Sequence, residues 1–374
     1  MIEIAGAYNN AKVMIPLGYD IEEYAITQIR TICDSEGVGK DIVIMPDVHP
    51  GKVGPIGLTI NIAYTKYIIP SLLGPDIGCG IIIAKLNNRV KKEYERIDTV
   101  IRENVPVGNN RFKAYEKRND KMYLHTGRST DEFSEFVGTL GGGNHFIEID
   151  VDEYRNYYLV VHSGSRGLGH YVYDYYMKEG QKVHKEREEN VPYELTKICG
   201  SLAADYVDDV KYCQEFAYYN RRAIITNICK KMKWEYESIV DAPHNFISFS
   251  SGKTLLRKGA CSARTGETVI IPVNSRDGII IGVGKGNTNW NSSAPHGSGR
   301  LIKRSEVANL HTVSEYKKIM KDNKVYSPNI SADTLSEAPF AYRDLSYIKE
   351  AIKDTVDITR VLKPIYNFKA GDNQ

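Results

Sequence analysis

Short runs of aliphatic residues, each bounded by glycine or proline, recur along the chain and constrain its fold more than any other feature. Runs of this length and composition are typical of β-strands. They cover residues 42–46, 56–62, 81–86, 145–149, 157–163, 246–249, 268–273 and 278–283. Because these runs do not alternate regularly with helical segments, the order disfavours a repeating βαβ sheet. We therefore expect an α+β fold with mixed or antiparallel sheets flanked by helices.

Two segments have the spacing of amphipathic helices. The longer runs from about Leu202 to Lys231, with apolar residues at three- and four-residue steps, and a shorter one follows Leu345 through Ile348 and Ile352. The chain has no internal repeat and no Pro- or Ser-rich linker, and its motifs spread from residue 45 to residue 300. We expect a single domain over residues 1–374.

Composition narrows the class of protein. No stretch approaches the twenty or so apolar residues of a membrane span, and the N-terminus lacks a signal-peptide pattern, so we expect a cytoplasmic protein with no membrane partner. The cysteines are scattered without a Cys-x-x-Cys pair, which indicates reduced thiols. They are Cys33, Cys79, Cys199, Cys213, Cys229 and Cys261.

The net charge is only +2, so binding of nucleic acid would need a local basic patch. A solvated face is the ordinary explanation of any such run. The candidate patches are Arg111, Lys113, Lys117, Arg118 and Lys121; Lys230, Lys231 and Lys233; and Arg300, Lys303 and Arg304.

Six segments place a candidate ligand or nucleophile beside glycines at the edge of an aliphatic run. Glycines let the backbone turn tightly and approach a ligand, while strand ends hold side chains still. The segments are MPDVHPG at 45–51, GPDIGCG at 74–80, GGGNHFIE at 141–148, HSGSRG at 162–167, PHNF at 243–246 and PHGSGR at 295–300.

Five residues of these segments form a ligand set for a transition metal: Asp76, Cys79, His145, His162 and His244. A carboxylate, a thiolate and imidazoles suit zinc, manganese or iron, and the residue types alone do not select the ion. A lone histidine or buried cysteine is more often structural, but a thiolate shared between two ions would make a paired site suited to phosphoryl transfer.

Glycine-rich segments with histidine and arginine suggest phosphate binding, with Arg166 and Arg300 as the candidate cations. The chain has no Walker loop and no Lys-x-Asp-Gly nucleophile motif. His296, between Pro295 and Gly297, is the candidate nucleophile because an imidazole can form a phosphoramidate. Its spacing is equally compatible with a sixth metal ligand.

Together these motifs resemble the RtcB family of tRNA-splicing RNA ligases. The resemblance extends to ADY at 204–206, NRR at 220–222, RKGACSARTGE at 257–267 and the lysine of NFKAG. It implies a sheet-and-helix fold around a central metal pocket with two Mn²⁺ ions. Cys79 would bridge them, His162 and His244 would complete one site, and Asp76 and His145 the other.

The resemblance also implies that GTP guanylylates His296 and that Arg166 and Arg300 steady phosphates. GTP contacts would fall on Asn144, His145, Phe146, Ile147, Glu148, His244, Asn245, Pro272, Val273, Asn274, Ser275, His296, Gly297, Ser298, Gly299 and Lys369. The implied reaction joins an RNA 3′-phosphate or 2′,3′-cyclic phosphate to a 5′-hydroxyl end, in tRNA splicing or RNA repair. The sequence leaves open the physiological RNA, the oligomeric state and the need for an activating protein.

Two rival functions and one departure from the family remain. A metal-dependent phosphoesterase would use the same ligands without guanylylation, and a metal-stabilised RNA-binding protein would not catalyse at all. In the segment after TVIIP, Arg276 and Asp277 replace the small residues of many family members, which bears on base preference.

Overall fold

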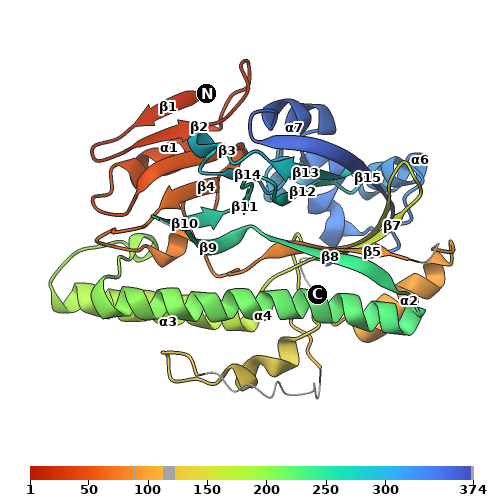
Figure 1. The fold of residues 1–374 in the computed structure, drawn as a ribbon, viewed down its shortest axis with the longest axis horizontal. Coiled ribbons are helices and arrows are strands. Elements are labelled where there is room, and N and C mark those ends of the chain that lie inside the picture. The colour runs from red at the N-terminus through yellow and green to blue at the C-terminus, as the bar shows by residue number, and fades with distance from the viewer. Residues whose placement is uncertain (88–89, 113–122, 251, 372–374) are drawn as a thin grey trace.

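The structure is a computed structural model and describes residues 1–374 except 88–89, 113–122, 251 and 372–374. Figure 1 shows how its helices and strands are arranged. The α-helices are α1 (Glu23–Cys33), α2 (Tyr94–Asn104), α3 (Gly167–Glu186), α4 (Gly200–Met232), α5 (Arg304–Leu310), α6 (Val313–Asp322) and α7 (Leu345–Ala351). Short 3-10 turns are η1 (Pro70–Leu72), η2 (Thr130–Phe136), η3 (Tyr193–Leu195), η4 (Thr288–Trp290), η5 (Ala332–Glu337) and η6 (Pro339–Ala341).

A six-stranded sheet occupies the N-terminal side of the molecule, in the order β1-β2-β3-β4-β10-β9. Its neighbours are antiparallel except β2 and β3, which are parallel. The strands are β1 (Ile2–Ala5), β2 (Asn10–Val13), β3 (Lys40–His49), β4 (Ile56–Asn61), β9 (Asn245–Ser250) and β10 (Lys253–Lys258).

A seven-stranded antiparallel sheet has the order β12-β13-β15-β6-β7-β5-β8. Its strands are β5 (Gly80–Leu86), β6 (Phe146–Val151), β7 (Tyr157–Ser163), β8 (Tyr236–Pro243), β12 (Thr268–Asn274), β13 (Gly278–Gly284) and β15 (Val356–Lys369). A small pair joins β11 (Ala260–Ser262) to β14 (Ser293–Pro295).

Side chains on both faces of β5 are buried, which explains why its sequence is apolar except at Lys85. Ile82 and Leu86 pack with α4 on one face, whereas Ile81 and Ile83 pack on the other face against residues of β12 and β13 from the far end of the same sheet. The sheet is therefore curled, so that its concave face closes on a core of its own. β5 is buried on both sides.

Helix α4 lies beneath both large sheets, beside α3 (Figure 1). Its 33 residues span about 50 Å, and it contacts β5 and β7 of one sheet and β9 of the other. Its buried residues recur at three- and four-residue steps from Tyr206 to Met232. It ends at Met232, and the C-cap residue Lys233 takes a left-handed conformation.

The predicted α+β class is confirmed, since all eight predicted strand runs coincide with strands and both predicted helices are present as α4 and α7. All six cysteines are free, as expected. No helix among the described residues is long and apolar enough to cross a membrane. A single domain over residues 1–374 stays a prediction.

Candidate active site and metal centre

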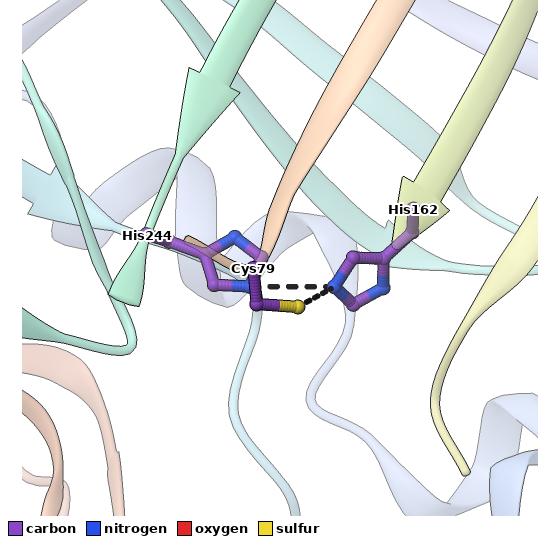
Figure 2. Close-up of side chains that lie close together, drawn as sticks. All are labelled: Cys79, His162 and His244. Carbon is purple, nitrogen blue, oxygen red and sulfur yellow. Dashed lines mark hydrogen bonds between the residues drawn. The ribbon is translucent and has the colours of Figure 1, made fainter. Parts of the chain in front are cut away.

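Strand register brings three of the predicted metal ligands together. Gly80 pairs with Ser163 of β7 and with Pro243 of β8, so the adjoining Cys79, His162 and His244 meet where β5 begins. The His162 Nε2 atom lies 3.2 Å from the Cys79 sulfur and 3.3 Å from His244 Nε2. Figure 2 shows the three side chains converging from different strands and segments.

Asp76 and His145 form a second group around the same sulfur. His145 Nε2 lies 3.5 Å from Cys79 Sγ and 3.5 Å from Asp76 Oδ2. A Cβ atom on Gly164 would come within 2.2 Å of Asp76 Oδ1, which explains the glycine in the HSGSRG segment. Cys79 thus belongs to both groups, and the ligand atoms of each group lie within 4.8 Å of one another.

Backbone carbonyls orient two of the imidazoles for metal binding. The His145 Nδ1 atom lies 2.8 Å from the carbonyl of Leu140, and His162 Nδ1 lies 3.1 Å from that of Asn144. Since a carbonyl only accepts, each Nδ1 carries the proton and leaves an Nε2 lone pair directed at the cluster. The donor set therefore fits one or two transition-metal ions.

Burial favours the neutral forms of two histidines and the cysteine in this cluster. Burial lowers the pKa of His162 and His244 well below the ordinary value and raises the pKa of Cys79 far above it. Burial also raises the pKa of Asp76, but its hydrogen bonds to His145 and Cys79, together with the charges of His145 and Arg166, outweigh that effect and hold the pKa below its usual value. A cation would displace the thiol proton and offset the negative charge.

Two polar residues on the buried face of α4 hold the loops of the cluster. Arg221 donates two hydrogen bonds to Asp241, of 2.7 and 2.8 Å, and Nη1 donates to the carbonyls of Gly78 and Ser163. Asn220 donates to Gly164 O at 3.0 Å and accepts from the amides of residues 138 and 139. The NRR segment is therefore a scaffold for the residues beside Cys79 and His162.

His296 lies next to the metal cluster and is held by a buried aspartate. Its ring centroid is 4.9 Å from that of His244, and its Nδ1 lies 2.6 Å from Asp47 Oδ2. The same oxygen accepts from the backbone amides of His296 and Gly297, each at 3.2 Å. Asp47 is fully buried, so it fixes both the ring and the start of the HGSG loop.

A cavity of about 950 Å³ opens beside His296. Most of the predicted nucleotide contacts line it, from β6, the β12–β13 turn, the HGSG loop and the end of β15. The predicted contacts on its wall are Asn144, Phe146, Glu148, Pro272, Val273, Asn274, Ser275, His296, Gly297, Ser298, Gly299 and Lys369. This volume is within the range of small-ligand sites.

Other predicted contacts lie off the cavity wall. Ile147 packs on the opposite face of β6, in the core beneath α4. His145 and His244 are in the metal cluster, and Asn245 ties the cluster loop to β10 by donating to Asp76 O and accepting from Gly259 N.

Charged residues gather at the cavity floor around Glu337. This buried carboxylate accepts from Tyr342 at 2.5 Å and lies 3.0 Å from Arg304, 3.3 Å from Arg300 and 3.6 Å from Lys369. Although burial raises the pKa of Glu337, the surrounding cations bring it down to about 2. The floor therefore carries more positive than negative charge.

The two predicted phosphate-binding arginines differ in position. Arg300 lines the cavity, but its guanidinium donates to Ile302 O, Ser336 O and Tyr342 as well as to Glu337. Arg166 lies behind the cluster and donates to Gly108 O at 2.7 Å. A Cβ on Gly141 would come within 2.1 Å of Arg166 Nη1, so the Arg166 guanidinium packs directly against the GGGNH loop.

The divergent residues Arg276 and Asp277 form a bidentate ion pair in the β12–β13 turn, with Nη2 2.8 Å from Oδ2. Asn274 also donates to Asp277 at 2.9 Å. The pair therefore stiffens the turn that presents Asn274 and Ser275 to the cavity. A consequence for base preference stays a prediction.

The basic patches also separate. Arg300, Lys303 and Arg304 line the cavity, whereas the lysines at 230, 231 and 233 are exposed at the end of α4. Arg111 pairs with Glu135, and the rest of that run, Lys113, Lys117, Arg118 and Lys121, lies outside the described residues.

The sequence interpretation missed the roles of Asp47, His49, Glu337 and Arg221. The first two lie in MPDVHPG, which was recognised as a motif without an assigned role. His49 lines the cavity, its Nδ1 lies 2.9 Å from Asp47 O, and burial lowers its pKa to about 4. Arg221 interrupts the apolar face of α4, which is a signal that sequence alone offers.

Comparison with known proteins decides the family. The family model described as tRNA-splicing ligase RtcB matches residues 28–131 and 120–370. The chain belongs to the RtcB family. It is 29% identical over 401 aligned positions to RNA-splicing ligase RtcB1 of Escherichia coli strain ATCC 25922, covering 94% of this chain and 95% of that protein. The RtcB match extends to archaea: tRNA-splicing ligase RtcB of Nanoarchaeum equitans is 25% identical, with 87% of each chain covered.

Proposed function

We propose that the chain is a GTP- and Mn²⁺-dependent RNA ligase that joins a 3′-phosphate or 2′,3′-cyclic phosphate end to a 5′-hydroxyl end through guanylylated His296. The observation that carries the proposal is the position of His296. Its ring is 4.9 Å from a ligand histidine, it lines a nucleotide-sized cavity, and it is bonded to a buried carboxylate. Family membership supports RNA as the substrate.

The metal cluster suits the phosphate chemistry of this reaction. Two Mn²⁺ ions held by Asp76, Cys79, His145, His162 and His244 would offset charge on phosphate oxygens. Cys79 would serve both ions, because it belongs to both ligand groups.

In the first step, His296 acts as the nucleophile towards the α-phosphate of GTP. Asp47 accepts a hydrogen bond from the Nδ1–H group of His296, so the lone pair is on Nε2. This lone pair is free to form the P–N bond while the bond to the leaving pyrophosphate breaks. The positive charge that develops on the ring is offset by the Asp47 carboxylate. The excess of cations around Glu337 suits the triphosphate.

In the later steps, a cyclic phosphate is first opened by water to a 3′-phosphate. An oxygen of this phosphate attacks the GMP phosphorus, and the P–N bond to His296 breaks. The 5′-hydroxyl of the second RNA end then attacks the activated 3′-phosphorus, loses its proton, and expels GMP. Activation is required because a phosphate monoester is a poor electrophile without a good leaving group.

Glu148 is the residue we assign to guanine. Glu148 is buried on the cavity wall, and its carboxylate accepts from Asn367 at 2.6 Å. A carboxylate can accept the two adjacent N–H groups of a guanine edge, whereas adenine offers no such pair.

The test is labelling of the protein by GTP. Incubation with α-³²P-GTP and Mn²⁺ should leave acid-labile label on the wild type and on His125→Ala, an exposed histidine outside the site. His296→Ala should remain unlabelled. With γ-³²P-GTP, none of the three proteins should take up label. Hydrolysis of phosphate esters without label on any variant would instead support the phosphoesterase alternative.

RNA binding and Mn²⁺-dependent stability without any joining of RNA ends would support the non-catalytic alternative. The free thiols and an RNA substrate favour a cytoplasmic location, and both this location and an activating protein stay predictions.

A further inference from the structure

The mouth of the cavity carries exposed apolar and aromatic side chains. Tyr24 at the start of α1 is 56% exposed and Leu301 is 59% exposed, and both line the cavity. Lys303 of the same edge pairs with Glu22, with Nζ 2.7 Å from Oε1. A tyrosine ring beside cations at the entrance of a polar cavity offers a stacking surface for a base.

Arg343 differs from the other cations of the cavity. It lines the cavity, and its guanidinium lies over the ring of Tyr347 at 4.5 Å and near that of Tyr19 at 5.8 Å. Its buried Nε has no hydrogen-bond partner, and among the described residues no carboxylate lies within ion-pair distance of it. By contrast, Arg300 and Arg304 both pair with Glu337.

An arginine whose guanidinium lies over one aromatic ring, and which has no ion pair among the described residues, is suited to bind an anion from the cavity. Stacking fixes the plane of the guanidinium, so little freedom is lost when a phosphate oxygen binds. The ring that supports it is itself fixed, since Tyr347 packs edge-on against Tyr19 at 4.6 Å.

Arg343 is also connected to the reaction centre. Its backbone amide donates to Gly299 O at 3.0 Å, in the loop that carries His296. The hydroxyl of Tyr347 donates to Pro46 O at 2.7 Å, beside Asp47. An anion bound by Arg343 therefore has a fixed position relative to the nucleophile.

We propose that Tyr24, Leu301 and Arg343, here called the mouth site, bind the single-stranded RNA next to the reacting end. The Tyr24 ring and Leu301 contact a base, and Arg343 pairs with a backbone phosphate. The inference rests on the proposed function and adds the residues that position its RNA. The triphosphate of GTP has the same anionic chemistry, but stacking on an exposed rim outside the cavity floor favours a polynucleotide.

The test compares RNA and GTP separately. Arg343→Gln, Arg343→Lys, Tyr24→Ala and Tyr24→Phe are measured for binding of a 3′-phosphate single-stranded oligonucleotide by fluorescence anisotropy, and for the KM of GTP in protein labelling. Control variants are Tyr64→Ala, whose ring is 99% exposed on another loop, and the exposed Arg222→Gln on α4.

We expect Arg343→Gln and Tyr24→Ala each to weaken RNA binding by about 5- to 20-fold. Tyr24→Phe should retain most of it, Arg343→Lys should retain only part of it because lysine keeps the charge but not the stacked plane, and the controls should retain all of it. The salt dependence of log Kd should fall by about one unit of slope in Arg343→Gln, as for one lost phosphate contact. The KM for GTP should not change.

Unchanged RNA affinity in Arg343→Gln and Tyr24→Ala would overturn the inference. So would a rise in the KM for GTP with RNA binding intact, which would assign Arg343 to the triphosphate. A wild type that binds RNA through the mouth site but takes no label from GTP would refute the proposed ligase and leave the mouth site standing.

Discussion

Asp47 Oδ2 lies 2.6 Å from Nδ1 of His296, across 249 residues of sequence. The carboxylate is fully buried, and its second oxygen has no hydrogen-bond partner among the described residues. A buried carboxylate stabilises a positive charge that develops on a ring bonded to it, because little water is near to screen the pair. The pair therefore suits the proposed step in which His296 bonds to phosphorus and its ring gains positive charge.

Asp47→Asn should reduce the rate of His296 labelling by GTP by about 10²- to 10⁴-fold, because the amide neither fixes the tautomer nor offsets the ring charge. Quenched-flow labelling measures the rate, and urea unfolding shows whether the variant has also lost stability. Asp174→Asn, an exposed carboxylate on α3, is the control. A rate within threefold of the wild type would remove Asp47 from the mechanism.

Loss of Cys79 should affect both metal ions, whereas loss of His145 should affect one. Cys79→Ala should weaken binding of two Mn²⁺ ions by more than about 100-fold, because its sulfur belongs to both ligand groups. His145→Ala should leave the ion held by His162 and His244. Isothermal titration calorimetry measures the stoichiometry, with Cys199→Ala as the control. Equal loss in the two variants would contradict a shared thiolate.

Local pattern was sufficient for the strands whose sequence is uniformly aliphatic. β15 could not be predicted that way: it joins the two halves of the large sheet, but its sequence holds charged residues and Pro364 at a register shift. α3 begins within a glycine-rich segment, which masks its helical period. Tertiary pairing, and not local preference, makes these elements.

The candidate site likewise contains residues that the sequence indicates and contacts that only the fold creates. The ligand residues have chemistry that a sequence displays, and Cys79, Asp76 and His145 lie together as the interpretation requires. Sequence spacing alone could not decide whether His296 is a nucleophile beside the metal cluster or a sixth metal ligand. In the structure His296 belongs to neither ligand group, which favours the nucleophile interpretation, and its partner Asp47, 249 residues away in the sequence, is brought to it only by folding.

Arg221→Met should destabilise the protein by about 3–5 kcal/mol, because it leaves Asp241 without its bidentate partner and frees two carbonyls beside the cluster. Arg222→Met, the exposed neighbour, should change the free energy of unfolding by less than about 0.5 kcal/mol. Urea unfolding measures both. Similar values for the two variants would show that the buried pair contributes no specific stability.

Stability should depend on pH through Glu148. Burial raises its pKa from 4.5 to about 7, against the opposing effects of Lys369 and Asn367. Below pH 4.5 the carboxyl is protonated in the folded and unfolded states alike. Between pH 4.5 and 7 the folded protein keeps a proton that the unfolded chain has released, so stability falls as pH rises through this window.

Glu148→Gln removes this titration, so its stability relative to the wild type should increase from pH 4.5 to pH 7.5. Urea unfolding at both pH values gives the comparison, and Glu103→Gln, exposed on α2, should show no such trend. The same substitution removes the acceptor for guanine and should raise the KM for GTP. A stability difference that stays constant with pH would mean that Glu148 is already ionised on the cavity wall, with Lys369 as its counter-ion.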